Sequence, residues 1–430
     1  MKFKYCKKLC ILILLIILSG LFLPRFSFAD ESTPQIYCPS ALLMDLNSGK
    51  ILYEKNIDEK KYPASLTKIM TAIIVLENCK LDDVAEVSYN AVMSISTGYV
   101  TANLQIGEEL TIEQLLYVLM VGSSNDAAVV LAEHVSGSVE EFAKLMNEKA
   151  KELGCTNTNF VNPNGEHDEN HYSTARDLAA ITKYAMKDEK FREIVATTSY
   201  KLPTTNKYDK DDRFFTTTNN LIIVNNNSRA DNYYYKYAIG IKTGFTTPAG
   251  NCLIAAASKG GLELLTVVLE GFQTDEGLSQ RYLDTKALFE YGYDTYTLRN
   301  VAKSGGIIQT TSIKNATRDT KKLDVVIEND VYVLSKQEDK DSSILPEVTL
   351  NDNLKAPIEK GEIIGKVKYT VEGIDYEENL LAANNVKKSH WFIKLILFSF
   401  IIFICLLYLD YRKRTRRRKA YKRKKYGGTY

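Results

Sequence analysis

The stretch YPASLTKIMTAIIVLEN, residues 62–78, decides how the fold is interpreted. Ser65 follows a proline and an alanine, and Lys68 comes three residues later, where an apolar helical run begins. Residues three apart lie on the same face of a helix, so the two side chains are expected to be within reach of each other. A serine becomes a good nucleophile when a base accepts its proton, and a lysine does this only when it is neutral. Taken alone, the pair favours the simpler interpretation of an N-cap serine with a solvated lysine.

Two further motifs follow at wider spacing. SSN at residues 123–125 falls at a break between two predicted helices, and KTG at residues 242–244 closes the strand-like YAIGIKTG. Each motif has a near copy, SYN at residues 88–90 and KSG at residues 303–305, although the second copy lacks a preceding buried strand. The three motifs in this order, each on the expected element, are a strong signal for serine nucleophile chemistry.

Residues 30–295 are expected to form one mixed α/β (α+β) domain, with a sheet flanked by a helical cluster. Strands are predicted on both sides of the helices in the chain, in residues 41–56, 237–244, 251–259 and 262–271. Helices are predicted from Ser65 onward and in residues 112–120, 127–135, 139–153, 174–186 and 280–294.

The second predicted domain, residues 299–385, alternates β-formers with polar residues and turn signals. Its sequence contains no pattern of catalytic or metal-ligating residues. The simplest interpretation is therefore a spacer between the first domain and a membrane. The chain ends support that topology. Residues 1–29 have the pattern of a secretory signal peptide cut after Ala29, with an uncleaved anchor as the open alternative. The apolar residues 391–409 are long enough for one transmembrane helix.

Charge is segregated along the chain, which has 55 lysines and arginines against 53 acidic residues. The basic residues concentrate in residues 1–29 and in the tail, residues 410–430, so the part between is acidic. Basic flanks stay cytoplasmic, which predicts a cytoplasmic tail and an extracellular body at the cell membrane. The tail is also expected to bind anionic lipid. An acidic body argues against nucleic acid as its partner.

The cysteines and histidines have no metal-ligand spacing, so no metal and no cofactor are expected. Cys38, Cys79, Cys155 and Cys252 lie in the exported part, where either two disulfides or buried free thiols remain open. The four histidines are scattered, which leaves a histidine-based triad without support.

The stretches PASLTKIMTA, VGSSNDAAV, HYSTARDLA and GIKTGFTTPAGNCL resemble the penicillin-recognising serine enzymes, most closely the low-molecular-mass penicillin-binding proteins that act as D-alanyl-D-alanine carboxypeptidases. The resemblance covers roughly residues 35–295. It implies a penicillin-binding or β-lactamase-like transpeptidase fold. It also implies removal of the terminal D-alanine from peptidoglycan stem pentapeptides, which limits cross-linking of the cell wall, and acylation by β-lactams. The β-rich part is similar to the family's second domain.

The resemblance also implies roles for individual residues. Ser65 would attack the carbonyl of the penultimate D-alanine, and neutral Lys68 would accept its proton. Ser123 would relay a proton to the leaving amine, and Asn125 would hold the substrate amide or Lys68. The KTG motif would bind substrate: Lys242 and Thr243 would meet the terminal carboxylate, with Gly244 beside them, and Lys242 would help to keep Lys68 neutral. The backbone N–H groups of Ser65 and Phe245 would form the oxyanion hole.

One departure leaves alternatives open. Glu166 follows Gly165 where these carboxypeptidases more often have an aliphatic residue, and Glu166 and Asn170 have the spacing that class A β-lactamases use to activate the deacylating water. We expect Glu166 to be a solvated acid, because the following HYSTARDLA matches carboxypeptidases. A β-lactamase is the alternative enzyme, and a membrane-anchored sensor of peptidoglycan or β-lactam, without turnover, is the alternative outside enzymes.

Overall fold

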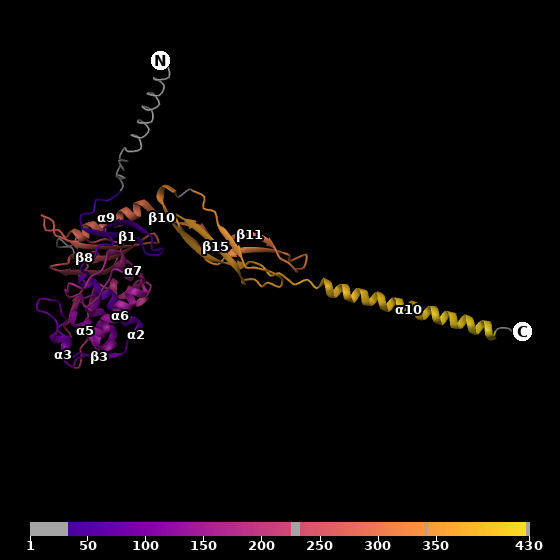
Figure 1. Cartoon of the computed structure of the whole chain (residues 1–430), viewed down its shortest axis with the longest axis horizontal. Coiled ribbons are helices and arrows are strands. Elements are labelled where there is room, and N and C mark those ends of the chain that lie inside the picture. The colour runs from indigo at the N-terminus through magenta and orange to yellow at the C-terminus, as the bar shows by residue number, and fades with distance from the viewer. Residues whose placement is uncertain (1–32, 225–232, 340–341, 427–430) are drawn as a thin grey trace, which may run out of the picture. The chain divides into compact units, whose positions relative to one another are not determined.

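The structure, a computed structural model, describes residues 33–224, 233–339 and 342–426 (Figure 1). The predicted signal peptide, residues 1–29, lies outside the described residues. The chain divides into two compact units, residues 1–295 and residues 296–430. The three motifs all belong to the first unit.

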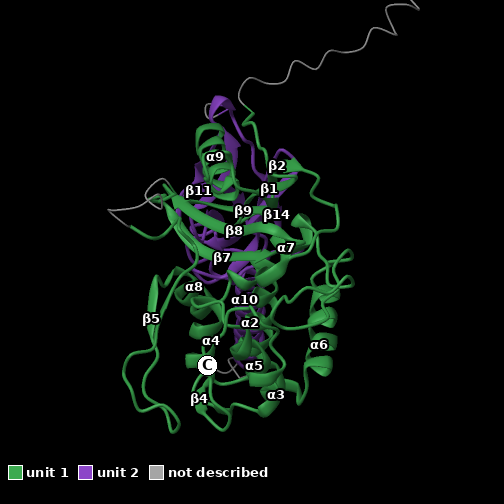
Figure 2. Ribbon diagram, turned by 90° about the vertical axis from the view of Figure 1, so that its left-hand side faces the viewer, with its two compact units in different colours: residues 1–295 green, residues 296–430 purple. Residues whose placement is uncertain are grey.

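A five-stranded antiparallel sheet forms the centre of the first unit, in the order β2-β1-β9-β8-β7. Its strands are β1 (Ser40–Asp45), β2 (Ile51–Lys55), β7 (Ala238–Thr246), β8 (Gly250–Lys259) and β9 (Leu262–Gly271). Helix α9 (Gln280–Thr295) covers one face, and α7 (Ala175–Ala185) and α8 (Glu189–Ala196) contact the other (Figure 2). Because both faces are covered, β8 and β9 are nearly continuous apolar runs.

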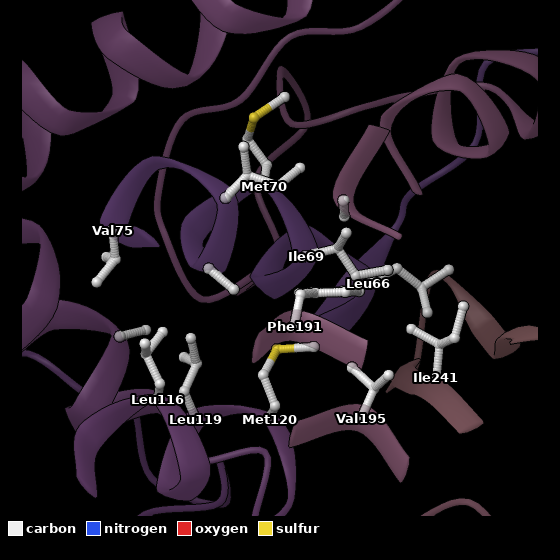
Figure 3. Packing of buried hydrophobic residues seen from close by; sticks show 14 of the residues in the cluster. Leu66, Ile69, Met70, Val75, Leu116, Leu119, Met120, Phe191, Val195 and Ile241 are labelled. Atoms are coloured by element: carbon white, nitrogen blue, oxygen red, sulfur yellow. The ribbon is translucent and has the colours of Figure 1, made fainter. Parts of the chain in front are cut away.

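The helical cluster is built around α2 (Lys68–Asn78), whose first eight residues are all buried. It packs on α4 (Ile112–Met120), α5 (Asn125–Ser136), α6 (Val139–Glu152) and α7. Figure 3 shows Ile69 of α2 on the side of the helix that faces Met120 of α4 and Val195 of α8, and Met70 on the opposite side; all four belong to one continuous core. The smaller elements of this unit are η1 (Ala64–Thr67), β3 (Val84–Glu86), α3 (Tyr89–Met93), β4 (Glu109–Thr111), β5 (Ser199–Lys201) and β6 (Phe214–Thr216). The predicted fold class, a sheet with a helical cluster, is therefore confirmed.

The start of the helix at Ser65 and Lys68 differs from the prediction. Ser65 lies in η1, a 3₁₀ turn, and the α-helix begins only at Lys68. Ala64 has a φ of +48°, a left-handed conformation that is uncommon for a residue with a side chain. Strand β7 and the backbone at Gly165 both pack closely against this turn. Tertiary contacts therefore override the helical propensity of the sequence here.

The cysteine alternatives are also decided by the structure. Cys38, Cys155 and Cys252 are buried free thiols, and Cys79 is a partly exposed one. Burial raises the pKa of the Cys252 thiol to about 11, which suits a small apolar core residue more than a reactive group.

The second unit is β-rich and ends in a long helix. Its main sheet has the order β11-β12-β16-β15-β14, and β10 pairs with β13. The elements are β10 (Tyr296–Ala302), β11 (Ile307–Ser312), β12 (Lys322–Ile327), β13 (Val331–Lys336), η3 (Gln337–Asp339), β14 (Glu347–Leu350), β15 (Ile363–Val371), β16 (Ile374–Ala382) and α10 (Trp391–Tyr426). Strand β10 begins three residues before the predicted domain start at residue 299.

Helix α10 spans 36 residues and includes both the apolar segment and most of the basic tail. We predicted these as separate segments. They form one helix because lysine and arginine are good helix formers. Its apolar part is long and apolar enough to cross a membrane by length and composition, which is consistent with membrane anchoring.

Candidate active site

The three motifs meet at one cavity of about 550 Å³ in the first unit. Of the predicted site residues, those exposed to the cavity are Ser65, Ser123, Asn125, Thr243, Gly244 and Phe245. The two lysines lie behind this lining: Lys68 is 0% exposed and Lys242 is 1% exposed. The structure therefore brings together residues that are separated by up to 180 positions in the chain.

The Lys68 side-chain nitrogen is held by three oxygen atoms. Its Nζ lies 3.0 Å from Ser65 Oγ, 2.7 Å from Asn125 Oδ1 and 2.6 Å from the Asn164 carbonyl oxygen. A neutral amine has two N–H donors and one lone pair. If the two N–H groups donate to the amide and carbonyl oxygens, the lone pair faces the Ser65 hydroxyl. This geometry suits a base better than a structural cation.

The electrostatic surroundings favour the neutral amine. Burial lowers the pKa of Lys68 well below its ordinary value, and the positive charge of Lys242 lowers it further. Asp126 and Glu166 act in the opposite direction, but burial is the larger effect. All three oxygens that contact Nζ belong to uncharged groups, so no carboxylate directly stabilises the ammonium form.

Lys242 joins the second and third motifs. Its Nζ donates to Ser123 Oγ at 2.8 Å and to the Thr243 carbonyl oxygen at 3.0 Å. Burial lowers the pKa of Lys242 to about 7, and the nearby Arg281 contributes to the shift. A carboxylate bound beside this group would stabilise its protonated form.

The SSN motif is shaped by backbone conformation as well as by side chains. Ser123 has a φ of +58°, which turns its hydroxyl toward Lys242 rather than into the helix that follows. Asn125 begins α5, and both its backbone N–H and its side-chain Nδ2 donate to the Val100 carbonyl oxygen at 2.9 Å. Next to it, the buried Asp126 accepts backbone N–H bonds from Ala102 and Leu104. Both residues therefore hold the loop that forms one wall of the cavity.

Two glycines allow the chain to close around Ser65. A Cβ on Gly244 would lie 3.2 Å from the Ser65 backbone nitrogen, and a Cβ on Gly165 would lie 1.9 Å from the Ala64 carbonyl oxygen. Gly165 also has a φ of +81°. The turn that carries Ser65 is thus packed tightly between β7 and the loop at residues 162–166.

Strand β7 lies at the edge of the sheet, since β8 is its one strand neighbour among the described residues. Its free edge faces the cavity, and the Phe245 side chain is 61% exposed there. An edge strand offers unpaired N–H and C=O groups, so an extended peptide can pair with it.

Sequence reasoning gave no role at the site to four residues that the structure places there. The Asn164 carbonyl contacts Lys68, and the Thr218 hydroxyl bonds that of Thr243. Arg281 lines the cavity and donates to the Gly244 carbonyl oxygen at 3.2 Å. Arg281 and Thr218 come from an ordinary helix pattern and a polar loop, and only the packing of the domain shows that they belong here.

His171 is the fourth missed residue. It is buried, its Nε2 lies 2.8 Å from the Thr67 hydroxyl, and its Nδ1 accepts the Val161 N–H at 3.1 Å. Because Nδ1 accepts, Nε2 carries the proton and donates to Thr67, which belongs to the same 3₁₀ turn as Ser65. Burial lowers the pKa of His171 to about 4, so the ring is neutral at physiological pH.

We expect this histidine to make stability depend on pH. At pH values between the pKa of about 4 in the folded chain and the ordinary pKa near 6.5, His171 is protonated in the unfolded chain but not in the folded chain. The stabilisation is present above pH 6.5 and declines as the pH falls toward 4, by roughly 3 kcal/mol in total. Thermal unfolding of full-length wild type in detergent should therefore shift to lower temperature over this range by more than that of His171→Gln.

The exposed His134 provides the matched control, since His134→Gln removes a histidine that faces solvent. Its unfolding temperature should depend on pH as the wild type's does. Parallel curves for wild type and His171→Gln would show that His171 does not titrate in this way.

The β-lactamase-like pair, Glu166 and Asn170, makes no direct contact in the described hydrogen bonds. Glu166 is partly buried, and its backbone oxygen accepts a bond from Asn162 Nδ2. Asn170 is exposed, and its backbone groups bond to Asp168 and Asn159. Among the described residues no hydrogen bond links Glu166 with Asn170. Glu166 is partly exposed to solvent, and its negative charge raises the pKa of Lys68.

Comparison with known proteins agrees with this geometry. The family model described as D-alanyl-D-alanine carboxypeptidase matches residues 28–273, and the model of the C-terminal domain of penicillin-binding protein 5 matches residues 296–388. The D-alanyl-D-alanine carboxypeptidase DacF of Bacillus subtilis (strain 168) is 32% identical over 359 residues, which are 82% of this chain and 87% of the relative. DacC of Escherichia coli (strain K12), also a D-alanyl-D-alanine carboxypeptidase, is 31% identical over 86% of this chain and 90% of its own length.

A solved structure gives the same result. Penicillin-binding protein 5 from Haemophilus influenzae has a TM-score of 0.62 and 30% sequence identity, and the match covers 83% of this chain and 99% of that one. One family model spans more than half of the chain, and the relatives match both of its units. The chain belongs to the D-alanyl-D-alanine carboxypeptidase family of penicillin-binding proteins.

Proposed function

We propose that this protein removes the C-terminal D-alanine from peptidoglycan stem pentapeptides through an acyl-enzyme on Ser65, and that β-lactams acylate the same serine. The observation that supports this most is the buried Lys68 amine 3.0 Å from Ser65 Oγ, with uncharged groups as its other partners. A neutral lysine in that place is a ready general base.

Substrate binding would begin with the terminal carboxylate. Lys242 and the hydroxyl of Thr243 would meet it at the free edge of β7, and Arg281 would add positive charge at the same end of the cavity. The scissile carbonyl would then lie at Phe245, where its oxygen accepts from the backbone N–H groups of Ser65 and Phe245. These donors would stabilise the negative charge that develops on the oxygen during attack.

Acylation would follow as a balanced proton transfer. Ser65 Oγ bonds to the carbonyl carbon of the penultimate D-alanine while its proton passes to the Lys68 lone pair. Collapse of the tetrahedral intermediate breaks the peptide C–N bond, and the leaving amine takes up, through Ser123, the proton that Lys68 accepted, which leaves Lys68 neutral again. Free D-alanine departs, and Ser65 carries the shortened peptide as an ester. Water then attacks the ester with Lys68 again as the base, which releases the tetrapeptide and restores Ser65.

The arrangement of the chain supports an exported enzyme held at the membrane. We propose that the first unit is extracellular, where peptidoglycan lies, and that the apolar part of α10 crosses the membrane once. The basic end of α10 would then be cytoplasmic, next to anionic lipid. The second unit would act as a spacer between the membrane and the catalytic unit.

Full-length protein in detergent, incubated with a pentapeptide ending in D-Ala-D-Ala, should release D-alanine and should be labelled by a fluorescent penicillin. Ser65→Ala should lose both activities by at least about a thousandfold, because the nucleophile is gone. Ser94→Ala, at an exposed serine, is the control and should match wild type.

The lifetime of the label separates the two enzyme functions. A carboxypeptidase should keep the penicillin label for a long time, whereas a β-lactamase should release it rapidly. Equal labelling of Ser65→Ala and wild type would contradict the assignment of the nucleophile, and a labelled protein that releases no D-alanine would favour a sensor.

A further inference from the structure

Three segments of the second unit meet at the end of its main sheet from which α10 leaves. They are residues 313–321 between β11 and β12, residues 351–362 between β14 and β15, and residues 383–390 after β16. Backbone hydrogen bonds join the first segment to each of the other two, and the second segment to the third. The three segments therefore form one continuous surface, called the basic end here.

The basic end carries more positive than negative charge. Its lysines and arginines are Lys314, Arg318, Lys321, Lys355, Lys360, Lys387 and Lys388. Its acidic residues are Asp319, Asp352, Glu359 and Glu362. All seven basic residues are exposed, and none of them takes part in a salt bridge within the part of the chain that the structure describes. Their charges are therefore available to a partner from solution or from a membrane.

The opposite end of the same sheet has the reverse charge. The turns before β11, after β12 and between β15 and β16 lie there. They contain the exposed acids Glu328, Asp330 and Glu372 and one exposed lysine, Lys303. Charge is thus polarised along the second unit, with the positive end at α10.

Covalent geometry places the basic end next to the membrane-length helix. The Ser389 backbone N–H donates to the Asn315 carbonyl oxygen at 2.7 Å, and α10 begins two residues later at Trp391. Two residues of extended chain span at most about 7 Å, whatever the angle of the helix. Trp391 is the one tryptophan of the chain, a residue type that is enriched where a membrane meets water.

We infer that, with α10 across the membrane as proposed above, the basic end binds the phosphate groups of anionic phospholipids on the extracellular face of the bilayer. Electrostatic attraction acts over about 8 Å at physiological ionic strength, which is about the reach from the first turn of α10 to this surface. The ammonium groups donate charge-assisted hydrogen bonds to the phosphate oxygens. The second unit then has a contact with the bilayer besides α10, which limits how far it can tilt.

Lysine acetylation in lipid nanodiscs tests this contact. Full-length protein is placed in discs of phosphatidylcholine alone or of equal parts phosphatidylcholine and phosphatidylglycerol, and acetylation by a water-soluble reagent is followed at each lysine by mass spectrometry. Lys314, Lys355 and Lys388 should react about fivefold more slowly in the anionic discs. Lys303, at the opposite end of the sheet, should react equally in both. At about 1 M salt the Debye length falls to about 3 Å, so the difference should disappear.

A double substitution, Lys387→Gln with Lys388→Gln, should reduce the protection of Lys314 in anionic discs from about fivefold to below about twofold, because two neighbouring charges are lost. Lys207→Gln with Lys210→Gln is the matched control. It removes the same charge at two exposed lysines of the first unit and should leave the protection of Lys314 unchanged. Penicillin labelling should be the same in both variants, because no substitution touches the active site.

Equal acetylation of Lys314 in neutral and anionic discs would overturn the inference and leave the proposed catalysis intact. Protection by dissolved polyphosphate but not by anionic discs would also overturn it, because the partner would then be a soluble polymer. A protein that does not enter the discs would contradict the proposed membrane crossing, and the inference would fail with it. Protection of Lys314 without release of D-alanine would contradict the proposed catalysis and support the membrane contact.

Discussion

Replacing Lys68 with methionine is expected to lower the rate of Ser65 acylation by about 10²- to 10⁴-fold, the usual contribution of a general base. Methionine has a similar length and tolerates burial, so it removes the amine without opening a large cavity. Without the lone pair of Nζ, nothing within 3.0 Å of Ser65 Oγ in the described contacts can accept its proton at neutral pH.

The measurement is the rate of labelling by a fluorescent penicillin at pH 7, with thermal unfolding as the check on folding. Lys68→Arg is an informative companion. Arginine keeps a positive charge but does not lose its proton in proteins, so it should be as inactive as methionine. Acylation at the wild-type rate in either variant would rule out Lys68 as the base.

The second large effect is expected at Gly165. A Cβ at this position would lie 1.9 Å from the Ala64 carbonyl oxygen, far inside contact distance. The loop has little freedom to move away, because Gly165 N–H donates to Asn162 Oδ1 at 2.7 Å. Gly165→Ala should therefore displace the turn that carries Ser65. A shift of about 1 Å costs about 100-fold in rate, and we expect a loss of acylation of at least that size.

Gly154→Ala is the matched control. Gly154 has a φ of +78°, nearly that of Gly165, but a Cβ at this position would have no atom within 4 Å. The substitution should cost about 1 kcal/mol of stability for the backbone conformation alone and leave acylation unchanged. Gly165→Ala should cost about 1–3 kcal/mol more, as overpacking does. Equal effects of the two substitutions on thermal unfolding and on labelling would show that the contact between Gly165 and the Ala64 carbonyl does not fix the position of Ser65.

The sequence determined the elements of the fold and the chemistry of its motifs. Apolar periodicity was sufficient to predict helices such as α4, whose bounds, Ile112–Met120, agree with the prediction. The strands β8 and β9 were recognisable as continuous apolar runs bounded by turns. The order of the three motifs indicated which serine and which lysines belong together, since local spacing and residue type are properties of the sequence itself.

The tertiary structure alone decided how those residues meet. Ser123 and Lys242 are 119 positions apart, yet their side chains lie 2.8 Å from each other. Ser65 lies in a 3₁₀ turn and not in the predicted helix, because β7 and the loop at Gly165, both distant from it in the sequence, pack closely against the turn. Arg281 lines the cavity although it belongs to none of the quoted stretches, and the contact between His171 and Thr67 is known only from the packing. Burial lowers the pKa of Lys68. Because that burial depends on all the elements packed around the side chain, the pKa cannot be predicted from any short stretch of sequence.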